Sequence, residues 1–381
     1  MTRGYSIYLD AIRFFASILV LFSHIAYPRF SNGDLAWVRD LNLGSDAVIL
    51  FFVLSGFVIA YTTESKQRTG ASYAKARIAR LYSVVIPAIL VTLLCDLLGR
   101  SINLAAYDGW WFNDDNLLEQ LFRVLTFSSQ AAGDNIRFGT NGPFWSVAYE
   151  AWYYAAFGIA VFARGWARVF LLTIVLLLAG MSIILLAPCW LTGVALQTLT
   201  SRMDASNVKP GTAWILALAP WAIYALWQAV DLPQTLTQLT FAMTGGTTHP
   251  SVLFGFADEF LWNNLLAVLF AAHFFGVYFL AKDERRFSQK AERGLRWLAG
   301  ATFSIYLFHY PLLTLLYALP GYESANPLHY WGAGAITLAL CFLLAEISER
   351  RLAAWAGMVD WLFARSRKLP KSGRSERPAL L

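Results

Sequence analysis

Residues 5–27, YSIYLDAIRFFASILVLFSHIAY, are apolar enough to form a membrane helix and yet include Arg13 and His24. An α-helix turns by about 100° and rises by about 1.5 Å per residue, so the two side chains lie about 16 Å apart on one face. An ionisable group in a bilayer is costly unless it faces a bundle interior or an aqueous cavity. The stretch therefore predicts a membrane helix whose polar face borders a protected pathway. In the alternative interpretation, Arg13 snorkels to the headgroups and His24 lies at the opposite interface.

The composition is that of a polytopic membrane protein. Of the 381 residues, 57% are hydrophobic and 14% are charged, whereas soluble domains carry about 25% charged residues. Many apolar stretches have the length that crosses a bilayer as a helix. The predicted fold is therefore all-α, a membrane helical bundle of about ten transmembrane helices. The first span is too long for a signal-peptide core and has no small-residue cleavage site, so we expect it to be retained.

The distribution of charge predicts which ends of the spans face the cytoplasm. The loops at 64–80 and 282–296 are basic, and most of the formal charge of +6 lies in the tail after Phe363. Basic flanks are typical of the cytoplasmic side, so both termini are expected there and the number of crossings must be even. Nine segments are clear, and residues 189–200 are a better tenth than 240–256. The predicted spans are 5–27, 46–63, 81–98, 144–163, 169–187, 189–200, 212–230, 259–281, 298–319 and 330–349.

The predicted organisation is a membrane domain at 1–363 followed by a basic, disordered cytoplasmic tail at 364–381. Such a tail is typical of contact with anionic membrane lipids, and we expect no nucleic-acid partner. Cys95, Cys189 and Cys341 lie in apolar segments without ligand spacing, so neither a metal site nor a disulfide framework is expected. In the polar segment at 100–143, the sequence Asp114-Asp115-Asn116 precedes leucines at helical spacing. This pattern predicts an amphipathic helix at the outer interface.

The topology brings several ionisable side chains to similar depths. Glu150 lies about six residues, roughly 9 Å, below the outer surface, and His309 lies beyond mid-membrane toward the outside. His24, Glu150 and His309 can therefore meet in one outward-facing pocket, in which the carboxylate would orient an imidazole that acts as a general base. Alternatively, Glu150 is a structural partner of Arg13 or Arg80.

A second set of residues suggests substrate contacts. Arg77 and Arg80, three residues apart, form a candidate phosphate-binding pair on the cytoplasmic side, although ordinary positive-inside flanking would look the same. Trp145, Ser146 and Tyr306 are candidate substrate-binding residues, and His309 belongs with them. The alternatives are an aromatic belt for the tryptophans and tyrosines near 150, and helix packing for Tyr306.

At these positions the sequence resembles acyltransferase family 3, the integral membrane O-acyltransferases that modify sugars and polysaccharides. The resemblance runs from Tyr8 to about Arg351. It is carried by Arg13 with ten residues to His24, by FFVLSGFVIA at 51–60, by RIARLY at 77–82, by WSVAYE at 145–150 and by SIYLFHYP at 304–311. Ser83 replaces a usual proline, and Glu349-Arg350-Arg351 stands where Glu-Lys/Arg-Pro is usual. No hydrolase-like extension is seen, so the membrane module alone is expected.

The resemblance implies an activity and a set of roles. Acetyl-coenzyme A, or another acyl-CoA, would donate the acyl group and place its phosphates against Arg77 and Arg80, with Arg13 holding phosphate or stabilising developing negative charge. His24, aligned by Glu150, would take a proton from a hydroxyl of a carbohydrate or glycolipid acceptor. The implied location is the cytoplasmic (inner) membrane of a bacterium. A succinyl or other acyl group, and a glycan transporter or flippase, are the alternatives that remain open.

Overall fold

The structure is a computed structural model that describes residues 1–67, 69–203, 208–281 and 288–366. Within these residues there is no strand, only an isolated bridge between Phe138 and Asn141. The elements in chain order are α1 (Arg3–Ile25), α2 (Pro28–Ser31), α3 (Ala36–Asp40), α4 (Leu43–Lys66), α5 (Gly70–Ile102), η1 (Leu104–Tyr107), α6 (Leu117–Leu125), η2 (Ala131–Gly133), α7 (Phe144–Phe162), α8 (Gly165–Ala179), α9 (Met181–Arg202), α10 (Pro210–Ala229), α11 (Leu232–Met243), α12 (Pro250–Phe254), η4 (Gly255–Ala257), α13 (Phe260–Leu280), α14 (Gln289–Ala299), α15 (Thr302–Tyr317), α16 (Pro327–Ala345), η6 (Glu349–Arg351) and α17 (Leu352–Ser366).

Six helical segments are long and apolar enough to cross a membrane: α1, α4, α5, α9, Pro250–Leu280 and Pro327–Phe363. Two bent pairs, α10 with α11 at 64° and α14 with α15 at 45°, raise the number to eight if each pair is one span. α8 is a shorter apolar helix. The predicted all-α membrane bundle is confirmed, whereas the count of ten and the sides of the termini stay predictions.

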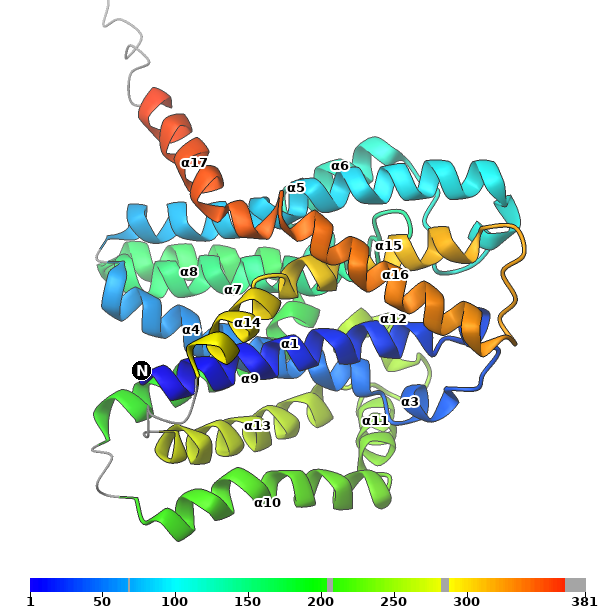
Figure 1. Ribbon diagram of the computed structural model, residues 1–381. Helices are drawn as coiled ribbons and strands as arrows, with labels where there is room; N and C mark the ends of the chain where they lie inside the picture. Colours follow the sequence, from blue (N-terminus) through cyan, green and yellow to red (C-terminus); the bar gives the residue numbers. More distant parts are fainter. Residues whose placement is uncertain (68, 204–207, 282–287, 367–381) are drawn as a thin grey trace, which may run out of the picture.

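The long helices lie side by side, and α1 lies at the front of the bundle in this view, between α14 and α13 (Figure 1). α1 packs against α4, α14 and α15, and α10 is attached at one edge through α13. α17 packs at its start on α5 and then extends away from the bundle. The polar face of α1 is therefore enclosed by other helices, as its charged residues require.

The close packing of α4 on α9 depends on two glycines, one of them in the 51–60 block. A Cβ on Gly56 would lie 2.0 Å from the carbonyl oxygen of Trp190, and one on Gly193 would lie 1.9 Å from that of Val53. Only glycine permits these backbones to approach so closely, which is the usual device for packing helices in membranes.

The boundary between the fifth and sixth predicted spans is wrong. The sequence interpretation placed it near Pro188, but Pro188 lies inside α9 and the chain breaks at Gly180. Gly180 has a φ of +81°, and a Cβ there would lie 2.9 Å from the backbone nitrogen of Ala132. Glycine is needed at this position for both reasons, whereas proline is tolerated within a helix of a packed bundle.

Two predicted cytoplasmic loops are largely helical. α5 begins at Gly70, where Thr69 and Ser72 form a capping box, so the segment 70–80 is helix and not loop. In the segment 282–296, the residues from Gln289 belong to α14, and residues 282–287 lie outside the described residues. The predicted tail at 364–381 lies outside them from residue 367 onward. The domain boundary therefore stays a prediction.

The predicted amphipathic helix is confirmed as α6. The side chain of Asn116 accepts hydrogen bonds from the backbone N–H groups of Leu118 and Glu119, as an N-cap does. Leu118 and Phe122 remain exposed on one face. Trp110, before α6, contacts Tyr27 just after the end of α1, and Arg137, after α6, lies over the ring of Trp110.

Candidate active site

A cavity of about 660 Å³ opens inside the bundle, and its charged lining is mainly basic. Five arginines and three carboxylates line it: Arg13, Arg77, Arg80, Arg296, Arg350, Asp10, Glu150 and Glu349. α4 contributes an apolar wall from Thr62 to Val48, a length of about 21 Å along the helix axis. The cavity therefore combines cations with an elongated apolar surface, which suits an anionic ligand with a long flexible arm.

Arg80 is held in place by an ion pair with Glu349. Its guanidinium donates to the Glu349 carboxylate at 2.7 Å. The other carboxylate oxygen accepts from the backbone N–H groups of Phe303 and Ser304 at 2.9 and 3.0 Å. Glu349 thus caps the N-terminus of α15 from outside the helix and fixes Arg80 beside it.

The positive charges of Arg13 and Arg77 are less closely paired with carboxylates than the charge of Arg80 is. Arg13 is 28% exposed and lies 3.9 Å from its nearest carboxylate, that of Asp10. The Nε of Arg77 is buried without a hydrogen-bond partner, and its guanidinium carbon lies 5.7 Å from the ring centres of Tyr73 and Tyr154. Both cations line the cavity, so they can bind an anion from a ligand without first breaking a close ion pair.

Glu150 lies in this cavity and not beside His24. Its carboxylate accepts hydrogen bonds from Ser55 and, at 2.5 Å, from the hydroxyl of Tyr154. The indole of Trp190 donates to the Ser55 oxygen at 3.1 Å. The structure shows no hydrogen bond between Glu150 and His24: Glu150 lies on α7 and lines the cavity with the arginines, with which it interacts electrostatically. Its expected role in orienting His24 stays a prediction.

The partner of His24 is His309. The Nδ1 of His309 lies 2.8 Å from the carbonyl oxygen of Ile305, and its Nε2 lies 3.0 Å from the Nδ1 of His24. Since a carbonyl only accepts, a neutral His309 carries its proton on Nδ1 and offers its Nε2 lone pair to His24. The Nδ1 of His24 also lies 2.9 Å from the carbonyl oxygen of Val20. His24 therefore carries its proton on Nδ1, which leaves the Nε2 lone pair for a substrate proton.

The hydrogen bond between Ser146 and Tyr306 lies at the end of the cavity that is nearest to the histidine pair. Ser146 donates to the hydroxyl of Tyr306 at 2.7 Å, and both residues line the cavity. Tyr306 lies one turn before His309 on α15, with ring centres 6.4 Å apart. The cavity therefore ends about one helical turn from the two histidines. Ser146 and Tyr306 lie at this end, between the arginines of the cavity and the histidine pair.

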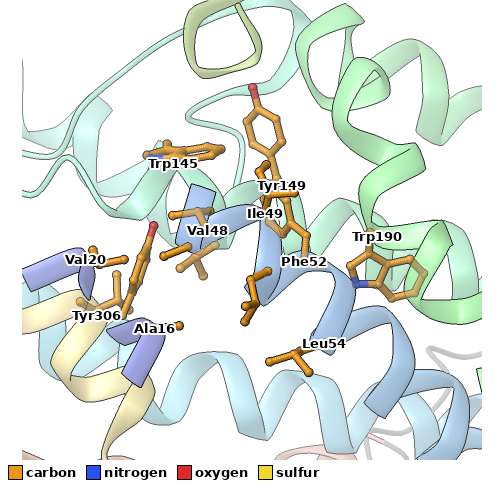
Figure 2. Close-up of a cluster of buried hydrophobic side chains, with 14 of the residues drawn as sticks. Ala16, Val20, Val48, Ile49, Phe52, Leu54, Trp145, Tyr149, Trp190 and Tyr306 are labelled. Carbon is orange, nitrogen blue, oxygen red and sulfur yellow. The ribbon is translucent and has the colours of Figure 1, made fainter. Parts of the chain in front are cut away.

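Trp145 lies at the same level but does not line the cavity. Its indole stacks on Phe256 with ring centres 4.6 Å apart. Figure 2 shows the Tyr306 hydroxyl directed toward the side of the bundle where Trp145 lies, above Val48. The arrangement favours a packing role for Trp145. Of the candidate substrate-binding residues, Ser146 and Tyr306 are the ones that line the cavity.

Some residues that shape the site were missed by the sequence interpretation. Glu349 was noted only as a departure from a motif, although a single acid among arginines at the end of an apolar helix is a signal for an ion pair. Ser55 was included only as part of the 51–60 block, yet it binds Glu150. Tyr154 was assigned to an aromatic belt, and no pattern in the sequence distinguishes it from its neighbours.

Comparison with known proteins identifies the family of the chain. The family model described as an acyltransferase domain, acyltransferase 3, matches residues 6–346. The chain belongs to this family. The resemblance drawn from the motif residues is thereby confirmed. The matched segment includes His24, His309 and the cavity-lining residues from Asp10 to Tyr306. Glu349 and the lining residues after it lie beyond the match.

Three curated relatives are similar to the chain. It is 28% identical over 152 residues to "Acyltransferase MdmB" of Streptomyces mycarofaciens, which covers 39% of this chain and 37% of the relative. It is 27% identical to "Peptidoglycan O-acetyltransferase OatA" of Listeria monocytogenes, over 92% of this chain and 55% of the relative. It is 24% identical to the "O-acetyl transferase" of Shigella phage Sf6, over 59% of this chain and 72% of the relative. The chain thus spans about half or less of the length of the first two. No solved structure matches it.

Within the part of the chain that the structure describes, no group of three or more histidine, cysteine, aspartate or glutamate side chains could hold a metal ion. Cys95, Cys189 and Cys341 are buried and unpaired with one another.

Proposed function

We propose that the protein is a membrane-bound O-acyltransferase that moves an acyl group, acetyl in the simplest case, from an acyl-CoA to a hydroxyl of a carbohydrate or glycolipid acceptor. The observation that carries the proposal is the arginine-lined cavity that ends one helical turn from the His24–His309 pair. Family membership and the names of two relatives, both O-acetyl transferases, support it.

The donor would bind in the cavity. Coenzyme A carries phosphates at one end and a long arm with the thioester at the other. Arg77 and Arg13 would bind the phosphates, with Arg80 held beside them by Glu349. The apolar wall of α4 would cover the arm and direct the thioester toward Ser146 and Tyr306. Since Arg13 lies about 16 Å from His24 along α1, it is suited to donor phosphate and not to the reacting carbonyl.

His24 would act as the general base. Its Nε2 would take the proton of the acceptor hydroxyl while the hydroxyl oxygen forms a bond to the acyl carbon. The C–S bond of the thioester then breaks, and the thiolate leaves and takes up a proton. His309 would keep His24 in the required tautomer by accepting from its Nδ1–H. Glu150 would act from the donor cavity, and its assignment as a catalytic residue stays a prediction.

The orientation in the membrane follows from the same assignment. The cavity residues Asp10, Arg13 and Arg296 lie toward the N-terminal end of α1, and His24 lies at the other end. Acyl-CoA is a cytoplasmic metabolite, so the N-terminal end would face the cytoplasm and the acceptor would approach from the outer side. We place the protein in the inner membrane of a bacterium, where its Lys and Arg flanks would be cytoplasmic.

The test is acyl transfer by the purified protein in lipid vesicles. Vesicles with radiolabelled acetyl-CoA and a panel of glycans are incubated with and without the protein, and the glycans are analysed by mass spectrometry. Acetyl ester on a glycan, with loss of label from acetyl-CoA, would support the proposal, and the mass would distinguish acetyl from succinyl donors tested in parallel. Movement of glycan across the vesicle membrane without consumption of any acyl donor would favour a transporter instead.

A further inference from the structure

Three arginines gather around the outer end of α1, on the far side of His24 from the cavity. Arg29 lies in α2, Arg39 in α3, and Arg137 in the loop before α7. Arg29 and Arg39 both interact electrostatically with His24, and Arg137 interacts with Arg29. We call these three residues the outer arginine cluster.

The cluster is connected to the histidine pair through Tyr310. Arg29 donates to the Tyr310 hydroxyl at 2.9 Å, and the Tyr310 ring packs edge-on against His24 with centres 4.9 Å apart. Arg39 donates to Ser23, the residue before His24, at 3.0 Å. The cluster therefore lies where an acceptor would have to approach the Nε2 of His24.

The cluster carries positive charge that no close carboxylate offsets. Across the described residues, none of the three arginines forms an ion pair. Glu259 interacts with Arg39 electrostatically, but its carboxylate accepts from Asn42 at 2.7 Å. The Nε and one terminal nitrogen of Arg29 are buried without a hydrogen-bond partner. Burial lowers the pKa of Arg29, and the positive Arg137 acts in the same direction.

The guanidinium groups rest on aromatic rings instead. Arg29 lies 4.4 Å from the ring centre of Trp111, and Arg137 lies 5.2 Å from that of Trp110. Arg39 lies 4.2 Å from that of Tyr27. Such contacts place a guanidinium over a ring face, and they leave its N–H donors available to bind a planar anion.

We propose that the outer arginine cluster binds an anionic group, a carboxylate or a phosphate, on the carbohydrate acceptor, and so selects acidic or phosphate-linked glycans. The proposal rests on the proposed acyltransferase function. A guanidinium pairs with either anion through two parallel N–H donors, and an anion here would offset the charge that the cluster carries. Trp110, which is 64% exposed, offers a ring face on which a sugar can stack. Arginines on the outer side also run against the usual distribution of positive charge, which calls for a specific role.

The test compares acceptors that differ only in their anionic group. The protein in vesicles is supplied with acetyl-CoA and one of three acceptors: an oligosaccharide that contains glucuronate, the same oligosaccharide with its carboxyl reduced, and the reduced oligosaccharide linked at its reducing end to pyrophosphate. The proposal predicts a kcat/KM at least about tenfold higher for one of the anionic acceptors than for the reduced one. A preference for the glucuronate form assigns a carboxylate, and a preference for the pyrophosphate-linked form assigns a phosphate.

The variants are Arg39→Gln and Arg137→Gln, both at half-buried positions, with Arg29→Lys to keep the buried charge. Each Gln variant should raise KM for the preferred anionic acceptor roughly tenfold and leave KM for the reduced oligosaccharide and for acetyl-CoA unchanged. Arg100→Gln, which removes an exposed arginine that lies over Phe112, is the matched control and should change neither. Equal kcat/KM for charged and reduced acceptors in the wild type would overturn this proposal and leave the acyltransferase intact. Failure to acylate any acceptor, with acetyl-CoA unconsumed, would overturn both.

Discussion

At the scale of single residues, the site consists of two groups with different surroundings. Arg13 and Arg77 line a cavity with polar and apolar walls, and His24 and His309 form a hydrogen-bonded pair beyond its end. Ser146 and Tyr306 lie between the two groups. This separation predicts that substitutions in one group change donor binding and that substitutions in the other change the chemical step.

Arg77→Gln should weaken donor binding. It removes a cation whose Nε has no partner within the protein, so little internal structure is lost, and a charge-assisted bond to phosphate contributes about 1.5–3 kcal/mol. We expect KM for acetyl-CoA to rise roughly tenfold or more with kcat nearly unchanged, measured by steady-state transfer. Arg293→Gln, at an exposed arginine of α14, is the control. A fall in kcat with unchanged KM would contradict a donor-binding role.

His309 should act by positioning His24. His309→Ala removes one of the two acceptors of the His24 Nδ1–H and leaves only the Val20 carbonyl, whereas the amide oxygen of His309→Gln can still accept it. We expect kcat to fall about a hundredfold in the alanine variant and much less in the glutamine variant, without a change in KM for acetyl-CoA. The pH profile of kcat should move in the alanine variant only. Equal losses in both variants would show that the imidazole of His309 has another role.

Some of these residues could be predicted from the sequence and some could not. Arg13 and His24 were predictable, because charges are rare in membrane helices and the spacing of eleven residues puts both on one face. The pairing of His24 with His309 instead of Glu150 was not. Depth along the helices placed all three nearby, but the direction in which Glu150 points depends on how α7 is rotated against α4. In the structure, Ser55 of α4 meets Glu150 and Tyr154 of α7, and this contact between helices has no signal in the sequence.

At the scale of elements, caps and glycines decide where helices begin and end. Asn116 gives α6 a side-chain cap, and this pattern can be identified from sequence. The break at Gly180 could not be identified, since its cause is a contact with the backbone of η2, about 50 residues earlier in the chain. Pro188 was the more prominent helix-breaking signal, but its effect is absorbed within α9.

Gly180→Ala should destabilise the protein. A Cβ there would lie 2.9 Å from the backbone nitrogen of Ala132, and the residue has a positive φ, which together cost about 1–3 kcal/mol. We expect the Tm in detergent to fall by several degrees. Gly332→Ala in α16, where a Cβ meets nothing within 4 Å, should leave the Tm unchanged or slightly higher. Equal behaviour of the two variants would show that the α8–α9 break does not need glycine.

At the scale of the whole molecule, the bundle holds the arginine-lined cavity, which is the proposed donor site, and the histidine pair at different positions along α1. The proposed topology places the cavity on the cytoplasmic side and the outer arginine cluster on the other. Such an arrangement would let a donor and an acceptor from opposite sides of the membrane meet near Tyr306. The structure contains helices that can cross a membrane, so the sides can be tested directly.

Thiol labelling in intact cells tests the topology. Because the three native cysteines are buried, single exposed substitutions report the side. We expect Asp108→Cys, between α5 and α6, to react with a membrane-impermeant maleimide in intact cells, and Lys290→Cys, in α14, to react only after the cells are opened. The opposite pattern would place the donor cavity on the outer side and remove acyl-CoA as a plausible donor.

The most direct test of the account is acetyl transfer by His24→Ala, measured together with its binding of acetyl-CoA. The variant removes the base and leaves Arg13, about 16 Å away along α1, and the other cavity arginines in place. We therefore expect acetyl-CoA to bind with near wild-type affinity while transfer to the glycan falls by roughly 10²–10⁴-fold. Transfer at a near wild-type rate would contradict the central claim that His24 is the base that activates the acceptor.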